Sequence, residues 1–79
     1  MENVFIVIVN YSNNMYCEWE EHENIEGVFA SFESAEAFIK RNFPDAFYES
    51  DIEAWVEKGQ TDHYEYDNTI CIVTYRVET

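Results

Sequence analysis

Val4-Phe5-Ile6-Val7-Ile8-Val9 decides the fold of this chain: all six residues are apolar and five are β-branched. A run of this kind is too short for a typical helix, and branched residues favour strands, so it predicts a buried β-strand. Alternation along the strand places its even-numbered residues on one side of a sheet and its odd-numbered residues on the other. Both sides are apolar, so both need cover from the rest of the chain.

The composition predicts one folded globular domain spanning residues 1–79. Of the 79 residues, 47% are hydrophobic and 18% are aromatic. That content of large apolar side chains is too high for intrinsic disorder, and a chain of this length builds a single small core.

The charge is the unusual feature of the sequence, since 17 Asp and Glu residues against 4 Lys and Arg give a net charge of −13. An excess this large costs stability through self-repulsion. It serves either solubility, including life in high salt, or the binding of a positively charged partner. Direct binding of DNA, RNA or an anionic membrane is disfavoured, because both surfaces would be negative.

The two cysteines, Cys17 and Cys71, do not amount to a disulfide framework. The N-terminus lacks the basic region and cleavage site of a secretory signal, and no apolar run approaches the ~18 residues of a membrane span. The sequence therefore predicts a cytoplasmic protein with free thiols.

The residues after the first strand predict a hairpin. Tyr11–Asn14 is typical of a turn, since Asn and Ser hydrogen-bond to nearby backbone. Residues 15–20 alternate large and polar side chains, as a half-exposed returning strand does. Residues 21–24 predict a bulge or loop, and residues 25–30 resume strand character, with Gly27 marking a bend or bulge. One bent strand and two separate strands both fit this stretch.

The segment Phe32–Phe43 carries the clearest helix signal. Ser31 is a favourable N-cap, and Glu33 lies near the positive end of the helix dipole. The apolar residues of the segment form one stripe at helical spacing, and Pro44 ends the helix.

The second half predicts another helix and a final hairpin. Four large apolar residues between positions 48 and 56 fall at helical spacing, which indicates a helix from Asp45 or Ser50 to Lys58, with Gly59 at its C′ position. Residues 63–66 and 69–77 read as strands, and Asp67-Asn68 between them predicts a tight turn. The predicted fold is therefore α+β, in the order ββ(β)ααββ: a small antiparallel sheet of four to five strands with two helices packed on one face.

The first half of the chain resembles a group of small proteins. The apolar first strand, the hairpin, Gly-Val-Phe-Ala-Ser (Gly27–Ser31) and Glu-Ser-Ala-Glu-Ala-Phe-Ile (Glu33–Ile39) are similar to small uncharacterised α+β domains of phages and their bacterial hosts, over residues 4–43. The resemblance implies a mobile-element origin, where inhibitors of host defence are common, and hence a place in the host cytoplasm. It transfers no functional residues.

Acidic residues concentrate in two segments, residues 18–26 and residues 45–67. If the second helix begins at Asp45, then Asp45, Glu49, Glu53 and Glu57 repeat every four residues along one helix face. Each like-charge pair at this spacing costs about 0.2–0.5 kcal/mol, and a lysine would remove that cost. The column therefore indicates that negative potential is itself the useful property.

Carboxylates at these spacings are compatible with charge mimicry of a nucleic acid. Same-face residues of a strand lie about 6.7 Å apart and i,i+4 neighbours on a helix about 6 Å, on the general scale of phosphates along a strand. The predicted function is therefore a non-enzymatic inhibitor that blocks the basic site of a nucleic-acid-binding protein, such as a host nuclease. The predicted partner-binding residues combine acids with two aromatic anchors: Glu18, Glu20, Glu21, Glu23, Glu49, Glu53, Glu57, Tyr16 and Trp19. The competing interpretation is a merely solvated acidic face.

The sequence predicts no cofactor, metal site or catalytic site. Calcium loops require Asp or Asn at alternate positions with a Gly and a final Glu, a pattern that no segment matches. Cys17, His22, His63 and Cys71 are chemically suitable zinc ligands, but they lack the spacing of zinc motifs. Paired catalytic carboxylates, a Cys–His nucleophile and a glycine-rich phosphate loop are equally unsupported.

A homodimer is the alternative hypothesis. Two helices cover only one face of a small sheet, so Phe5, Val7 and Val9 would contribute to a partly apolar open face with tyrosines and a tryptophan nearby. The sheet face would then be the interface of a structural or regulatory module, and the acidity would serve solubility. In the opposing interpretation, residues 11–26 fold back over that face.

Overall fold

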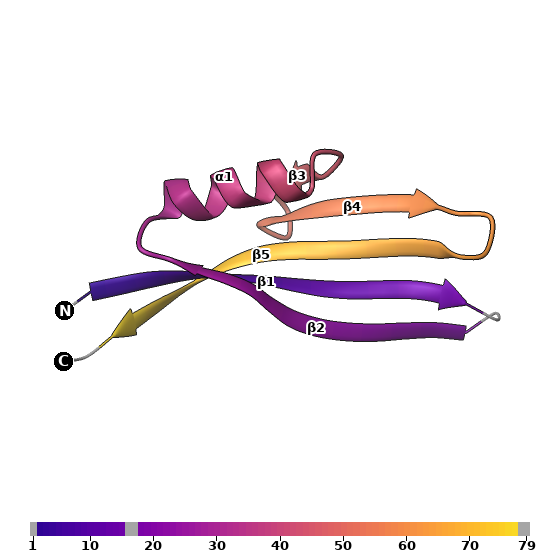
Figure 1. Cartoon of the computed structure of the whole chain (residues 1–79), viewed down its shortest axis with the longest axis horizontal. Coiled ribbons are helices and arrows are strands. Elements are labelled where there is room, and N and C mark those ends of the chain that lie inside the picture. Colours follow the sequence, from indigo (N-terminus) through magenta and orange to yellow (C-terminus); the bar gives the residue numbers. More distant parts are fainter. Residues whose placement is uncertain (1, 16–17, 78–79) are drawn as a thin grey trace.

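The computed structural model describes residues 2–15 and 18–77. Within them, five strands form one antiparallel sheet and one helix packs on it. The elements in chain order are β1 (Glu2–Met15), β2 (Glu18–Phe29), α1 (Phe32–Asn42), β3 (Phe47–Glu49), β4 (Ala54–Gln60) and β5 (Glu65–Val77). The strand order is β2-β1-β5-β4-β3, with both described chain ends at the same end of the sheet (Figure 1). The fold is mostly β, and the prediction of an α+β fold with two helices is wrong.

The first two strands are longer than the sequence predicted. The turn expected at Tyr11–Asn14 and the loop expected at residues 21–24 are wrong, because both stretches are paired strand: residues 11–14 of β1 pair with residues 19–22 of β2, and residues 21–24 of β2 pair with residues 9–12 of β1. β2 is one continuous strand with a bulge: Val7 pairs with Gly27 and Ile8 with Ile25, so Glu26 is the extra residue. The expected bulge near Gly27 is therefore confirmed.

The helix that the sequence predicted is confirmed as α1. The Ser31 side-chain oxygen accepts a hydrogen bond from the Ser34 backbone N–H at 3.2 Å, and the Phe43 N–H closes the last turn on the Ile39 carbonyl at 2.8 Å. Pro44 follows at once. Local signals therefore fix both ends of the helix.

We expect Ser31→Ala to lower the free energy of unfolding by about 1 kcal/mol, because the Ser34 N–H loses its capping acceptor. Urea denaturation of the variant and wild type measures this loss. Ser50→Ala, at an exposed turn position, is the matched control and is expected to change stability by less than about 0.5 kcal/mol. Equal losses in the two variants would contradict the capping role.

The predicted second helix is wrong, since its residues form β3, a turn and β4. The turn places Glu53 at a φ of 51°, and the Glu53 N–H donates to the Ser50 carbonyl at 3.3 Å. β4 pairs with β5, with Trp55 opposite Ile70. Without β4, the backbone groups along that edge of β5 would lack strand partners, so sheet pairing overrides the helical spacing of the segment.

The last hairpin turns earlier than the sequence predicted. Asp67 and Asn68 lie inside β5, and the turn is closed by the Thr61 N–H, which donates to the Tyr64 carbonyl at 2.8 Å. Gly59, expected to follow a helix, lies within β4 opposite Tyr66.

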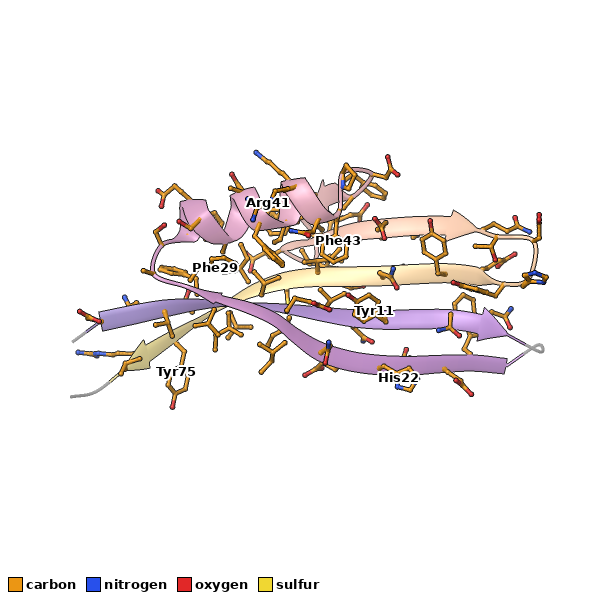
Figure 2. The ribbon with its side chains drawn as sticks, in the orientation of Figure 1. Tyr11, His22, Phe29, Arg41, Phe43 and Tyr75 are labelled. Carbon is orange, nitrogen blue, oxygen red and sulfur yellow. The ribbon has the colours of Figure 1, made fainter. Side chains whose placement is uncertain are left out.

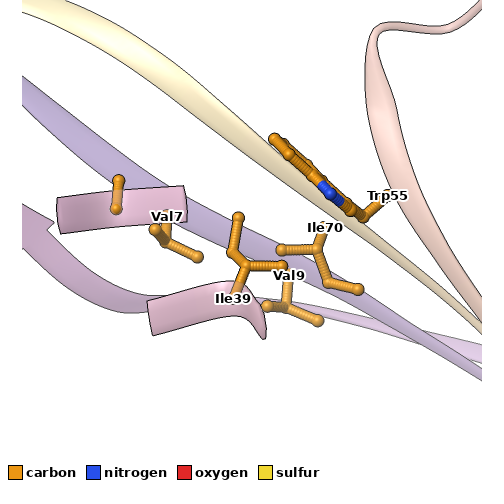
Figure 3. Close-up of a cluster of buried hydrophobic side chains, with 6 residues drawn as sticks. Val7, Val9, Ile39, Trp55 and Ile70 are labelled. Carbon is orange, nitrogen blue, oxygen red and sulfur yellow. The ribbon is translucent and has the colours of Figure 1, made fainter. Parts of the chain in front are cut away.

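The core lies between α1 and one face of the sheet, which we call the helix face. Six buried residues meet there: Val7, Val9, Ala35, Ile39, Trp55 and Ile70 (Figure 3). Val7 and Val9 are thus buried between the sheet and α1 and Phe5 packs against the same cluster, so the expectation that these three residues lie on an open face is wrong. Val4, Ile6 and Ile8 occupy the other face, which we call the open face. Residues 11–15 and 18–26 extend the sheet and do not fold back over the open face.

Candidate protein-binding surfaces

The sheet changes from apolar to polar partway along its strands. On the open face, Ile8 pairs with Ile25, whereas the next residue on that face, Asn10, pairs with Glu23. We call the part of the sheet from Ile8 toward the chain termini the terminal half, and the part from Asn10 toward the β1–β2 connection the hairpin half. α1 lies over the terminal half alone, so the hairpin half is a single layer (Figure 1).

The hairpin half gathers acidic residues from β2, β4, β5 and the β4–β5 turn. Seven of them lie in this half: Glu20, Glu21, Glu23, Glu57, Asp62, Glu65 and Asp67. Glu26, at the bulge on the terminal side of Ile25, accepts a hydrogen bond from Tyr11 of the hairpin half, and we call these eight residues together the acidic end. Among the described residues of this half, Lys58 is the one lysine or arginine, and it pairs in register with Asp67. Alternation puts Glu21 and Glu23 on the open face and Glu20 and Glu57 on the helix face, so both faces are negative.

The predicted partner-binding residues fall into three groups. Trp19, Glu20, Glu21 and Glu23 lie together on the exposed part of β2, and Glu57 reaches the same half from β4. Glu49 ends β3 and Glu53 lies in the β3–β4 turn, so both are outside the acidic end. Glu18 begins β2, and Tyr16 is outside the described residues.

The predicted acidic helix column does not exist. Without a second helix, the four acidic residues of that column lie in a loop, two strands and a turn: Asp45, Glu49, Glu57 and Glu53 respectively. The argument from i,i+4 repulsion therefore no longer applies. The structure instead adds Glu65 and Asp67, which line a shallow hollow together with Trp19 and Lys58. The period-two spacing of Glu65 and Asp67 is the sequence signal that places them on one strand face.

A second hollow, of about 280 Å³, lies beyond the end of α1 on the helix face. Its lining is Tyr11, Asn13, Glu57, Tyr64, Tyr66 and Asn68, and we call it the tyrosine hollow. Tyr11 Oη donates to Glu26 Oε1 at 2.5 Å, and Asn68 Nδ2 donates to Glu57 Oε1 at 3.3 Å. The Asn68 Oδ1 in turn accepts the Ser12 N–H at 3.3 Å. The walls of the hollow are therefore held by hydrogen bonds.

Burial, the hydrogen bond to Glu26 and the charges of Glu26 and Glu57 raise the pKa of Tyr11 to about 12. A raised pKa favours the protonated phenol in the folded state, so its contribution to stability is complete below the ordinary value of 10.0 and is lost as the pH rises from 10.0 to about 12.

We expect the difference in tyrosinate absorbance between wild type and Tyr11→Phe to show a titration near pH 12. The stability advantage of wild type over Tyr11→Phe should shrink across the same alkaline range. A difference spectrum centred at the ordinary tyrosine pKa would contradict this assignment.

Cys71 is a free thiol on the open face. Burial, with a smaller effect of the Glu23 carboxylate, raises the pKa of the Cys71 thiol, so it is protonated at neutral pH and a weak nucleophile. Across residues 2–15 and 18–77, no group of three or more His, Cys, Asp or Glu side chains is placed to hold a metal ion. In the same residues, no helix has the length and apolar character to cross a membrane.

Comparisons with known proteins found no relative of this chain. No family model, curated protein or solved structure matches the chain.

Proposed function

We propose that the protein is a non-enzymatic binding module whose acidic end occupies, and thereby blocks, a basic nucleic-acid-binding site of another protein. The observation that carries the proposal is the concentration of eight carboxylates, with Lys58 alone to offset them among the described lysines and arginines, on both faces of a single-layer sheet. A thin layer that is negative on both faces is suited to entering a positively charged groove.

The carboxylate geometry supports the proposal. Glu21 and Glu23 lie on the same strand face at about 6.7 Å, and Glu21 and Asp67 lie on the two sides of β1 at about 10 Å. Trp19 is 54% exposed beside these acids and offers an aromatic anchor of the kind that contributes strongly to interfaces.

The test is capture of nucleic-acid-binding proteins from a cell lysate on immobilised protein, followed by elution with a DNA oligonucleotide. We expect wild type to retain basic proteins at low salt and to release them to DNA or high salt. A Glu20/Glu21/Glu23→Lys variant, whose net charge changes from −13 to −7, should lose the capture. Glu2/Asp45/Glu49→Lys has the same net charge with the acidic end intact, and it should retain the captured proteins. Equal loss in both variants would reduce the effect to net charge and sink the proposal.

The second candidate function is a homodimer through the terminal half of the open face. This surface is unusually apolar, since Ile25, Val28, Val73 and Tyr75 are 63%, 59%, 41% and 60% exposed. Figure 2 shows Tyr75 projecting away from α1. Exposed apolar patches of this kind mark interfaces. Two copies with antiparallel strands could overlap here while their acidic ends point in opposite directions, which limits charge repulsion.

The dimer has its own test. Val28→Asp should shift a dimer to a monomer in size-exclusion chromatography with light scattering, while Glu20/Glu21/Glu23→Lys should leave the mass unchanged. Val7→Asp is unsuitable, because Val7 is fully buried under α1. A wild type that is monomeric at all concentrations tested would exclude this candidate.

A further inference from the structure

We infer that the tyrosine hollow binds a basic side chain of a protein partner through its ammonium or guanidinium group. This inference rests on the proposed function, because it names the position in the acidic end where one positive group of the partner docks. The hollow faces the helix side of the sheet and is separate from the open-face acids on β2.

The aromatic walls are positioned by the surrounding backbone. The Tyr66 ring lies over Gly59 on the neighbouring strand, where a Cβ atom would come within 2.1 Å of the Tyr66 hydroxyl oxygen. Only glycine leaves room for that ring. The Tyr64 ring follows at a centroid distance of 6.4 Å and an interplanar angle of 58°.

The turn that carries Tyr64 is held by Thr61. The Thr61 hydroxyl oxygen accepts from the His63 and Tyr64 backbone N–H groups at 3.2 and 3.1 Å, and the Thr61 N–H donates to the Tyr64 carbonyl. The rings of Tyr64 and Tyr66 are therefore presented by a hairpin whose turn has its own hydrogen bonds, and less order has to be created when a ligand binds.

The chemistry of the lining selects an organic cation. Tyrosine ring faces are negative and attract ammonium and guanidinium groups. Glu57 adds a carboxylate, and the charge of Glu26 acts on the same Tyr11 hydroxyl as that of Glu57. The lining includes no basic side chain in the part of the chain that the structure describes. An anion would therefore meet the negative charge of Glu57 with no basic side chain in the lining to offset it. A divalent metal ion would find a single lining carboxylate, fewer than such ions need from a protein.

The direct test is an NMR titration of the 79-residue chain with N-acetyl-arginine amide and N-acetyl-lysine amide at constant ionic strength. We expect saturable shifts confined to Tyr64, Tyr66 and Glu57, with dissociation constants in the millimolar range. N-acetyl-glutamine amide, a neutral probe of similar size, should produce none. Glu57→Gln and Tyr64→Leu should each weaken binding about threefold, whereas Tyr75→Leu, at the other end of the sheet, should leave it unchanged.

Two results would overturn the inference: shifts that sodium chloride reproduces, or equal responses to the cationic and neutral probes. If either result were found while basic proteins were still captured, cation binding by the tyrosine hollow would be refuted and the proposed function would be retained. Saturable binding of the cationic probes without capture of any basic protein would have the opposite meaning, since the hollow would then bind organic cations independently of that function.

Discussion

Ile39→Ala is expected to lower the free energy of unfolding by about 2–5 kcal/mol. Ile39 is fully buried in the cluster that joins α1 to the sheet, together with Val9 and Ile70 (Figure 3). The truncation removes apolar contacts and leaves a cavity that the surrounding structure closes only in part. A chain of this size has a total stability of about 4–12 kcal/mol, so the variant should lose a large share of it.

The matched control for this prediction is Ile25→Ala, the same chemical change at a residue that is 63% exposed on the open face. Its expected loss is less than about 1 kcal/mol, because most of the side chain is already in water. Urea denaturation followed by circular dichroism measures both variants. Similar losses at the two positions would mean that the helix-to-sheet cluster is not the centre of stability.

The helix was predictable because its signals are local. Ser31 accepts from a backbone N–H three residues ahead, and Pro44 prevents continuation within two residues of the last helical residue. Neither effect depends on where the rest of the chain lies. The first strand was predictable for a similar reason, because a branched apolar run favours extended backbone in any context.

The segment between Asp45 and Lys58 could not be assigned in the same way. Trp55 and Val56 satisfy a helical period together with Tyr48, but they also fit the start of a strand. What decides between them is the pairing of β4 with β5 across the turn at residues 61–64, which the apolar spacing of residues 45–58 does not contain. Strand choice is a non-local property, so the acidic helix column inferred from this segment failed with it.

The candidate surface was predicted in part. The acidic residues on β2 were identified because they lie close together in sequence, although the stretch opposite them in β1 was mistaken for a turn. Tyr11–Asn14 is polar because α1 does not reach the hairpin half, so these strand residues have no core to enter. Polar strands without a helical cover resemble turns in sequence, and only the pairing register brings Glu65 and Asp67 to the same surface.

A Glu21→Val and Glu23→Val double variant is expected to self-associate into large oligomers at concentrations where wild type does not. β2 is a 12-residue strand at the edge of the sheet, with a row of backbone donors and acceptors that can pair with another copy. Charged side chains on such a strand oppose that pairing. Valine would remove two charges and extend the apolar surface of Ile25 along the open face, so both barriers to association would fall together.

The control for this prediction is a double variant that carries Glu21→Lys and Glu23→Lys. Its mass is measured beside that of the valine variant by size-exclusion chromatography with light scattering. Lysine protects an edge strand as well as glutamate does, so this variant should keep the wild-type mass. It reverses the potential of the acidic end, however, and should weaken capture of a basic partner. A valine variant with the wild-type mass would show that these carboxylates do not guard the edge. If the lysine variant retains both its mass and its partner, these two glutamates serve the sheet edge and not recognition, because only recognition depends on the sign of the charge.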